Sequence, residues 1–285
     1  MRFKRVYVEI GNICNLNCSF CSEVKREKRQ MTVSEFSHIA KEVKPFCDYL
    51  YFHIKGEPLL HPHLSEFFDI AEEYNFLVNI TTNGTLLDKT GDMILSKKAL
   101  RQINISLHSF PAHKMDGYLS TVLNFSKKAS LEHKKYVVLR FWNLDNTRKT
   151  NKASLDMLNK IKEYFNFEGD LFEAMKGRSV MLEKGIFISF EEEFEWPSLE
   201  NPFISDTGIC YGTRNMLGIL ADGTVTPCCL DANGEAPLGN IFKTPLADMM
   251  ENIDKIAFNL TNRHIDLELC KRCSYRTRFD KIKIV

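Results

Sequence analysis

Short apolar, β-rich segments alternate with helical patterns along most of the chain, and this alternation limits the folds that it can adopt. The segments are too apolar for strands that expose one face to water, so they predict buried parallel strands. We expect strands over 6–10, 49–54, 76–81, 102–107, 136–142 and 185–190. Such β/α units predict an α/β fold with right-handed crossovers, either an open doubly wound sheet or a partial barrel.

Helical stripes lie between these segments. Apolar residues recur at helical spacing from Val33 to Phe46, and Thr32 and Glu35 precede them in the order of a capping box. Similar stripes cover 64–74 and 155–165. In both candidate folds ligands bind at the carboxyl ends of the parallel strands, so residues that follow each strand are the candidates for a functional site.

Composition narrows the class of protein. The chain has 285 residues, enough for a barrel and a small second unit, and its 38 basic and 37 acidic side chains nearly cancel. This balance indicates no nucleic-acid or membrane partner. The N-terminus has no apolar core of signal-peptide length, and no run of apolar residues could span a membrane. We therefore expect a cytoplasmic protein, in which nine cysteines indicate metal or redox chemistry.

Three of these cysteines follow the first predicted strand in a C-x3-C-x2-C arrangement: Cys14, Cys18 and Cys21. Three thiolates can bind three irons of a cubane cluster and leave the fourth iron open to another ligand. A zinc site usually has four protein ligands, and a disulfide framework needs an even number of cysteines and an extracellular setting. The spacing therefore indicates an iron–sulfur cluster with an open iron.

A second set of cysteines lies near the C-terminus. Four of its members form two pairs: Cys210, Cys228, Cys270 and Cys273. Four thiolates fit a closed metal site, for which zinc is the default in isolation. Asp222 and Gly223 predict a hairpin turn between strands over 216–220 and 224–226. Cys47, at the end of the first helical stripe, is expected to be a small buried side chain.

With Phe20 as its aromatic residue, the first cysteine motif resembles the C-x3-C-x-aromatic-C loop of the radical S-adenosylmethionine (SAM) enzymes. The resemblance implies a partial (β/α)6, TIM-like barrel over residues 1–200, with Cys14, Cys18 and Cys21 as catalytic cluster ligands. It also implies that the open iron binds SAM and that one electron cleaves SAM to methionine and a 5′-deoxyadenosyl radical. A reductant such as flavodoxin or ferredoxin would supply that electron.

The same resemblance implies SAM contacts at the strand ends. Lys55, Gly56, Glu57 and Pro58 resemble the family's G-G-E-P motif, with lysine in place of the first glycine, a change that is acceptable if its side chain points away. Asn83 lies in a turn that resembles the family's T-N-G turn but also fits an ordinary Asn-Gly turn. The SAM-binding residues implied are Phe20, Gly56, Glu57, Asn83, Ser106 and Arg140.

Arg140 also stands out on physical grounds. A guanidinium in an otherwise apolar strand must find an anion or pay a large desolvation penalty. The family resemblance assigns it, with Ser106, to the SAM carboxylate, and an ion pair with Glu9 is the alternative. His108 either faces substrate at a strand end or is a hydrogen-bonded histidine of the barrel mouth.

The C-terminal motif, C-x12-G-x4-C with Gly223, resembles the auxiliary-cluster domain of SPASM/Twitch radical SAM enzymes. It lacks the further cysteines of a full SPASM domain, so the match is to the shorter Twitch form over 201–285, the type found in the dehydrogenase of butirosin biosynthesis. The resemblance implies one auxiliary [4Fe-4S] cluster on the four paired cysteines and hence two clusters per chain. Neighbouring strand residues point to opposite faces, so Cys229 either packs as a small apolar side chain or donates a hydrogen atom.

We therefore expect a radical SAM oxidoreductase that removes two electrons from a small-molecule or peptide substrate. A carboxylate within 191–195 is a candidate general base, although this stretch also fits a solvated connector. A ribosomal-peptide maturase that makes thioether crosslinks or epimerised residues is the alternative. The start of the sequence at the first predicted strand leaves no room for a leader-binding domain, which weighs modestly against it, although a separate protein could supply that function. From another class, a non-catalytic iron–sulfur or zinc scaffold remains.

Overall fold

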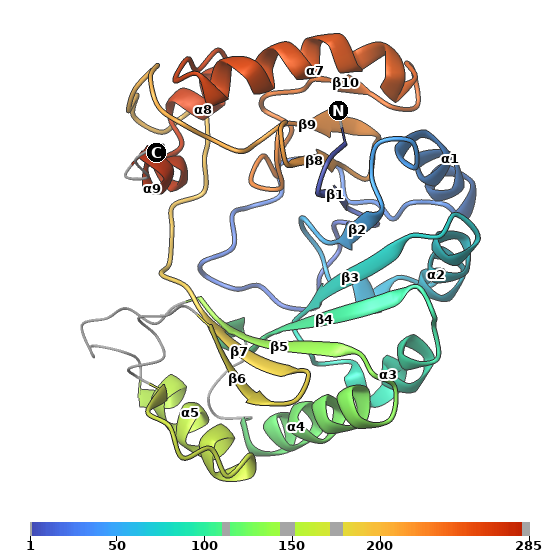
Figure 1. Cartoon of the computed structure of the whole chain (residues 1–285), viewed down its shortest axis with the longest axis vertical. Coiled ribbons are helices and arrows are strands. Elements are labelled where there is room, and N and C mark those ends of the chain that lie inside the picture. Colours follow the sequence, from blue (N-terminus) through green and yellow to red (C-terminus); the bar gives the residue numbers. More distant parts are fainter. Residues whose placement is uncertain (1, 110–114, 143–151, 172–178, 281–285) are drawn as a thin grey trace. The chain divides into compact units, whose positions relative to one another are not determined.

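The computed structural model describes residues 2–109, 115–142, 152–171 and 179–280 (Figure 1). Two compact units make up the chain: Met1–Leu77 together with Phe194–Val285, and Val78–Glu193. Both units combine strands with helices, as the alternating sequence pattern predicts. The boundary near residue 200 between a barrel and a C-terminal domain stays a prediction.

The first unit contains strands from both ends of the chain. Its elements are β1 (Arg5–Val8), α1 (Val33–Val43), β2 (Tyr49–Phe52), a 3₁₀ turn (Pro58–Leu60), α2 (Leu64–Glu73), β8 (Met216–Ile219), β9 (Thr224–Thr226), β10 (Gly239–Asn240), α7 (Leu246–Thr261), α8 (Glu268–Lys271), a second 3₁₀ turn (Ser274–Arg276) and α9 (Thr277–Asp280). The strand order in this unit is β10-β9-β8-β1-β2. β1 is parallel to both β2 and β8, whereas β8, β9 and β10 form an antiparallel meander.

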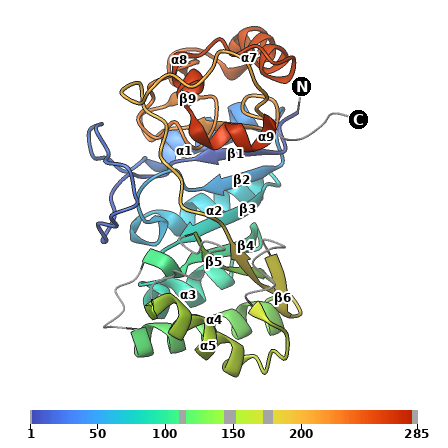
Figure 2. The ribbon, with the colours of Figure 1, turned by 90° about the vertical axis from the view of Figure 1, so that its left-hand side faces the viewer.

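The second unit continues the β/α alternation. Its elements are β3 (Leu77–Thr82), α3 (Leu87–Leu95), β4 (Leu100–Ser106), a 3₁₀ turn (Leu107–Ser109), α4 (Met115–Leu131), β5 (Tyr136–Phe141), α5 (Lys152–Tyr164), β6 (Ser179–Glu183) and β7 (Ile186–Phe190). The order is β3-β4-β5-β7-β6, and all neighbours are parallel except β6. α4 packs against β5, β7 and the adjacent helices α3 and α5 (Figure 2).

The predicted strands are confirmed as β1 to β5 and β7, with their ends shifted by one or two residues, and the predicted parallel pairing is confirmed as well. The alternation did not predict β6. This strand lies at the edge of its unit and is only partly buried, so it lacks an apolar pattern. A tight turn at Gly185, where φ is +77°, joins it to β7.

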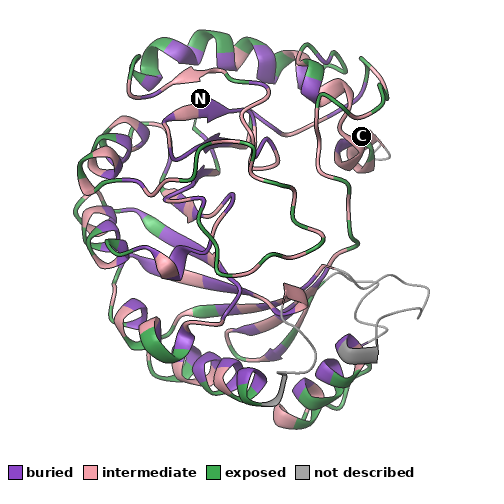
Figure 3. Ribbon diagram, turned by 180° about the vertical axis from the view of Figure 1, so that it is seen from behind, coloured by how far each residue is buried: buried purple, intermediate pink, exposed green. Residues whose placement is uncertain are grey.

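The core of the first unit forms where apolar strand faces meet α1 and α2 (Figure 3). The Phe36 ring lies 4.6 Å from that of Phe67 and 5.3 Å from that of Phe52. The predicted capping box starts α1: Glu35 N donates to Thr32 Oγ1 at 3.2 Å, and Thr32 N donates to Glu35 Oε2 at 2.8 Å. Because successive strand residues alternate, the other face of β1 and β2 carries the polar side chains.

The predicted C-terminal hairpin is also present. Leu220 N donates to Thr224 O at 2.9 Å across a turn that contains Gly223, at φ +84°. A Cβ atom at Gly223 would lie 2.4 Å from the Phe242 ring, so only glycine fits both the backbone conformation and the space. β8 also pairs in parallel with β1 along its whole length, which joins this hairpin to the first strand of the chain.

His61 generates a prediction about stability and pH. Only 6% of it is exposed, and burial, with a smaller contribution from His63, lowers its pKa to about 4. The unfolded chain therefore binds a proton below the ordinary pKa of about 6.5 while the folded chain does not, so stability falls as the pH falls. Between pH 7 and pH 5 the wild type should lose about 2 kcal/mol more unfolding free energy than His61→Leu. Urea titrations of the metal-free proteins at both pH values test this, and parallel losses would contradict it.

Candidate functional site

The first cysteine motif lies in a closed loop, residues 11–30, which we call the cysteine loop. Gly11 and Gln30 form an antiparallel bridge at its neck. Asn12 fastens the same point, because its Nδ2 donates to Glu27 O at 2.9 Å and its Oδ1 accepts from Arg29 N at 2.8 Å. The loop therefore leaves the end of β1 and returns to it, which holds the motif at the carboxyl end of that strand.

Within the loop, Cys14 and Cys21 are exposed and Cys18 is half-buried. Cys21 N donates to Cys18 O at 3.1 Å, so these two residues share one turn. No disulfide joins any of the nine cysteines. Among the described residues, no three His, Cys, Asp or Glu side chains are arranged as ligands of a single metal ion. The donor set suits a cubane cluster, in which each thiolate binds a different iron.

Gly56 and Glu57 follow β2 and pack against the start of the cysteine loop. Gly56 has φ +78°, and a Cβ atom there would lie 2.4 Å from Gly11 O, so the backbone approach requires glycine. Glu57 N donates to Ile13 O at 2.9 Å. The Glu57 carboxylate is buried and accepts from Leu59 N at 3.0 Å, which caps the 3₁₀ turn after it. Their contact with SAM stays a prediction.

Lys55 does not point away from the site, contrary to the condition under which we considered its replacement of glycine acceptable. Its residue is only 5% exposed. Its Nζ lies 3.1 Å from Cys21 Sγ and 2.8 Å from Ser22 O. Lys55 follows β2, and its side chain is long enough to reach the thiol, which a glycine could not do. The structure thus places a cation directly on one of the motif cysteines.

Trp196 is a second contact of the cysteine loop that the sequence did not indicate. Its Nε1 donates to Phe20 O at 2.9 Å, and its ring lies 4.0 Å from Lys55 Nζ. Trp196 itself is fixed by Asn201, whose Nδ2 donates to Trp196 O at 2.9 Å. Phe20 is half-buried in this arrangement. No local pattern around Trp196 distinguishes it from an ordinary connector residue.

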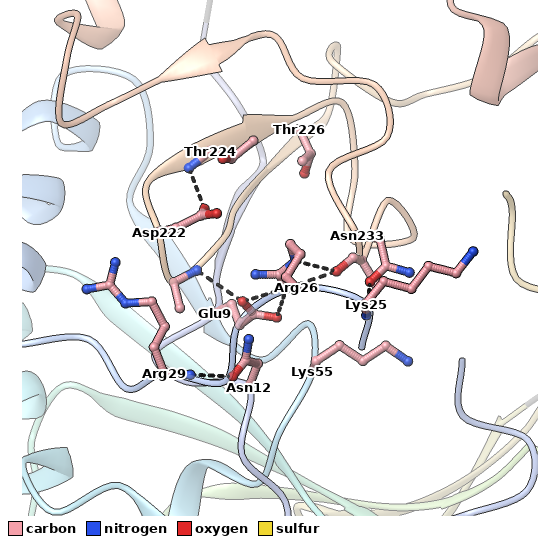
Figure 4. A network of polar contacts seen from close by, with 12 residues as sticks. Glu9, Asn12, Lys25, Arg26, Arg29, Lys55, Asp222, Thr224, Thr226 and Asn233 are labelled. Atoms are coloured by element: carbon pink, nitrogen blue, oxygen red, sulfur yellow. Dashed lines mark hydrogen bonds and ion pairs between the residues drawn. The ribbon is translucent and has the colours of Figure 1, made fainter. Parts of the chain in front are cut away.

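Beneath the cysteine loop lies an ion pair between Glu9 and Arg26 (Figure 4). Arg26 Nη2 is 2.8 and 2.9 Å from the two Glu9 carboxylate oxygens, and Glu9 Oε2 also accepts from Ala221 N at 3.0 Å. The Glu9 side chain is fully buried, and burial raises its pKa against the opposing effect of Arg26. Arg26 Nε further donates to Ala232 O at 3.1 Å. The pair therefore joins β1, the cysteine loop and the segment after Cys229.

Asn233 makes a second connection between the same segments. Its Oδ1 accepts from Lys25 N at 3.0 Å, and its Nδ2 donates to Glu23 O at 3.2 Å. The side-chain amide thus accepts a hydrogen bond from one backbone group of this segment and donates one to another, as a neighbouring strand would, and this fixes the segment. Thus residues 23–26, directly after the first cysteine motif, are held by 232–233, directly after the cysteine pair at 228–229.

In the second unit the strand register brings Ser106 and Arg140 side by side at the carboxyl ends of β4 and β5. The Arg140 guanidinium lies 3.6 Å from the ring centre of Trp142, and its Nη1 is 3.5 Å from Thr81 Oγ1. The alternative partner that we considered, Glu9, is engaged by Arg26. The register supports the predicted pairing of Ser106 with Arg140, and their role toward SAM stays a prediction.

His108 and Asn83 lie near this strand edge. Burial lowers the pKa of His108 to about 4, so the ring is neutral near neutral pH. Its Nδ1 lies 3.1 Å from Arg140 O and 3.4 Å from Trp142 N. Asn83 Oδ1 accepts from Thr85 N at 3.0 Å, which is the geometry of an ordinary Asn turn. Both residues have structural roles here.

The four paired cysteines of the C-terminal region gather in the first unit. Cys210 and Cys228 both lie next to Gly212. A Cβ atom added to Gly212 would be 3.7 Å from Cys210 Sγ and 3.8 Å from Cys228 Cβ. Burial raises the pKa of Cys228, and the nearby Cys229, Cys210 and Cys270 raise it further. Burial likewise raises the pKa of Cys273, with Cys210 again a neighbour. The four paired cysteines are partly buried and linked through Cys210 and Cys270, which fits a closed cluster site, because bound iron would supply the positive charge that their thiolates need.

Cys229 lies in different surroundings from Cys228. It packs against an apolar cluster of Tyr7, Ile54, Leu220 and Ala232. Burial raises the pKa of Tyr7, and Cys229 is the neighbour that raises it most. Cys228 and Cys229 lie in the bend and turn that follow β9, which ends at Thr226, so strand alternation does not apply to them. Which of the two joins the other three cysteines as a ligand stays a prediction. Cys47 is fully buried, as expected of a small core side chain.

The acidic stretch 191–195 resembles a connector more than a site. Glu192, Glu193 and Glu195 are exposed, and Glu191 N donates to Phe141 O at 2.8 Å. A general base among them stays a prediction. Among the described residues, no helix is both long enough and apolar enough to cross a membrane.

The Glu9 and Arg26 pair generates a prediction about stability. Arg26→Met should lower the unfolding free energy by about 3–5 kcal/mol, because it leaves the Glu9 carboxylate buried without its cation. Glu9→Gln combined with Arg26→Met should lose less, since no charge then remains buried. Lys25→Met is the matched control, because its ion pair with Glu200 is solvent-exposed. Urea unfolding of metal-free protein measures all three, and equal losses for Arg26→Met and Lys25→Met would refute the assignment.

Comparison with known proteins agrees with this geometry. The family model of the radical SAM superfamily matches residues 8–167, and that of an iron–sulfur cluster-binding domain, SPASM, matches residues 210–274. A SAM-dependent 2-deoxy-scyllo-inosamine dehydrogenase from Niallia circulans is 21% identical over an alignment of 285 residues. The alignment covers 95% of this chain and 93% of that protein. A tungsten-containing aldehyde ferredoxin oxidoreductase cofactor-modifying protein from Pyrococcus furiosus is 32% identical, over 38% of this chain and 30% of that protein.

Solved structures show the same fold. BtrN in complex with AdoMet and 2-DOIA matches with a TM-score of 0.61 at 18% identity, over 96% of this chain and 94% of that chain. SuiB of Streptococcus suis bound to SAM matches with a TM-score of 0.58 at 16% identity, over 95% of this chain and 70% of that chain. The fold is thus the expected partial barrel with a C-terminal SPASM-like domain, and its cofactors are SAM and iron–sulfur clusters. The chain belongs to the radical SAM superfamily, in its SPASM/Twitch subgroup.

Proposed function

We propose that this radical SAM enzyme is an oxidoreductase that removes two electrons from a small polar substrate. The observation that supports it most is the second cysteine set, which gathers four thiols in the unit that also holds the first motif. When bound, the two clusters and SAM would supply a hydrogen-abstracting radical and an acceptor for the substrate's second electron. The similarity to a dehydrogenase over 95% of the chain points the same way.

The chain's own residues have separable tasks in this proposal. Cys14, Cys18 and Cys21 hold the catalytic cluster on the cysteine loop, whose neck keeps it at the end of β1. Gly56 admits close backbone approach, and Glu57 supplies a buried carboxylate beside it for the SAM ammonium group. These five residues lie in the first unit.

In the second unit, Ser106 and Arg140 offer a hydroxyl and a guanidinium to the SAM carboxylate from neighbouring strands. The centre of the Trp142 ring lies 3.6 Å from the guanidinium carbon, which restrains the donors and limits their loss of entropy on binding. His108, neutral at neutral pH because of burial, adds no second positive charge beside Arg140. We also assign Asn83 and Phe20 to the SAM site on the family resemblance.

A polar substrate is favoured by the inner face of the second unit. Across β3, β4 and β5, the rows of this face carry mostly amide, hydroxyl and guanidinium groups: Asn79, Thr81, Gln102, Asn104, Ser106 and Arg140. Tyr136 and Val138 on β5 lie beside them. The opposite face is apolar and buried, as Ile103 and Ile105 show. A face with many hydrogen-bond donors and acceptors suits a hydroxylated or amino-substituted small molecule better than an apolar one. The relative's named substrate, 2-deoxy-scyllo-inosamine, belongs to that class.

A peptide substrate is the second candidate. SuiB bound to the precursor peptide SuiA matches this chain with a TM-score of 0.57, and anSMEcpe with bound AdoMet and Cp18Cys peptide matches with 0.55. These likenesses support a ribosomal-peptide maturase forming a crosslink or an epimerised residue. We propose in either case a cytoplasmic enzyme that takes electrons from a reductant such as flavodoxin or ferredoxin and acts on neither nucleic acid nor membranes.

SAM cleavage tests the proposal directly. Anaerobically reconstituted enzyme with dithionite should release 5′-deoxyadenosine, and the variant with alanine at Cys14, Cys18 and Cys21 should release none, because it cannot hold the catalytic cluster. With 2-deoxy-scyllo-inosamine as a probe, the product should be lighter by two hydrogens, as measured by mass spectrometry. A peptide product with a crosslink or an inverted residue would support the maturase instead. Absence of 5′-deoxyadenosine under all conditions would leave only a scaffold role.

The two adjacent cysteines provide a sharper prediction about the auxiliary site. Cys228→Ala should lose about half of the iron, because one of four ligands is missing from the second of two clusters. Cys229→Ala should keep the iron and SAM cleavage, because its side chain packs against Tyr7 and Ile54 instead. Iron and sulfide analysis of the reconstituted variants measures this. The reverse pattern would show that Cys229 is the ligand, and full iron with no product in Cys229→Ala would make it a hydrogen donor.

A further inference from the structure

Lys55 is a buried cation. Its hydrogen-bond acceptors Cys21 Sγ and Ser22 O both belong to the cysteine loop. An ammonium that is only 5% exposed must be compensated, and Lys55 Nζ reaches Cys21 Sγ at 3.1 Å and Ser22 O at 2.8 Å. Glu9, a carboxylate that also acts on Lys55, is already paired with Arg26. The Cys21 sulfur is therefore the contact of Lys55 that would carry negative charge once it binds iron. A thiolate that binds iron keeps lone pairs and still accepts such a hydrogen bond.

Trp196 fixes Lys55 in this position. Its ring covers the ammonium at 4.0 Å, and its Nε1 donates to Phe20 O, next to Cys21. An aromatic face over a desolvated ammonium stabilises the charge, and the ring also keeps water from the contact. With less water present, the interaction between Lys55 and the Cys21 sulfur is less screened. The cation is thus built into the site and is not a flexible surface side chain.

We propose that Lys55 tunes the reduction potential of the cluster held by the first cysteine motif. This inference rests on the proposed assignment of Cys21 as a cluster ligand. One-electron reduction adds negative charge next to the Cys21 sulfur, and a fixed ammonium with an N–H···S hydrogen bond stabilises that added charge. The electron comes from a one-electron donor such as reduced flavodoxin or ferredoxin, and no covalent bond forms or breaks. A glycine at position 55, as in the family motif that this segment resembles, provides no such charge.

The test compares neutral and charged variants of the reconstituted enzyme. Lys55→Met and Lys55→Gly remove the charge, Lys55→Arg keeps it, and Lys25→Met removes an exposed lysine from the same loop. Electron paramagnetic resonance at a series of poised potentials, with and without SAM, follows the cluster whose signal SAM alters. At the wild-type midpoint, the ratio of reduced to oxidised cluster should fall about tenfold in the neutral variants, equivalent to 59 mV for one electron. Lys55→Arg and Lys25→Met should stay close to the wild type.

Two outcomes would overturn the inference. The first is a wild-type midpoint in both Lys55→Met and Lys55→Gly with full iron content. The second concerns the geometry and needs no cluster: in metal-free Trp142→Phe protein, which keeps Trp196 as its remaining tryptophan, Lys55→Met should change the emission and Lys25→Met should not. No change in emission would mean that the ammonium does not lie on the ring. A wild type that holds no SAM-responsive cluster would instead refute the proposed function itself.

Discussion

The first unit depends on one buried carboxylate, that of Glu9 at the end of β1. Fully buried, it needs compensation, and it obtains this from Arg26 of the cysteine loop and from the Ala221 amide of the C-terminal hairpin. β1 is also the strand that pairs with both β2 and β8, so segments more than 200 residues apart in sequence meet at one point. The Glu9 carboxylate thus connects the cysteine loop to the C-terminal hairpin.

This connection gives the SPASM-like region a structural role besides holding a cluster. Asn233, four residues after Cys229, adds two hydrogen bonds between the same segments. The turn that presents Cys228 follows β9, whose register is fixed through β8 by β1. The first cysteine motif and the turn that carries Cys228 are therefore both positioned from β1.

The features that could be predicted from the sequence are those that depend on neighbouring residues in the chain. Buried parallel strands follow from unbroken apolar runs, the start of α1 from Thr32 and Glu35, and the hairpin from Gly223, whose φ of +84° few other residues adopt. The prediction that Cys228 and not Cys229 is a ligand assumed strand alternation, whereas both residues lie in the turn after β9. β6 was missed because an exposed edge strand carries no apolar period. The contacts of Arg26 and Trp196 could not be predicted, since their partners lie 206 and 176 residues away.

Lys55 shows why a motif comparison alone misleads. In a comparison with the family motif, Lys55 only differs from the usual glycine. The motif says which residue is usual, and it does not say where the side chain of a different residue lies. The two cysteine sets differ in how a neighbouring cation contacts them. Near the second set, Arg276 donates to Cys270 O at 3.0 Å and shares its charge with Asp280 at 3.3 Å, whereas Lys55 donates directly to the Cys21 sulfur. Direct contact with a sulfur atom outweighs a compensated charge at a backbone carbonyl, so Lys55 acts more strongly on Cys21 than Arg276 does on Cys270.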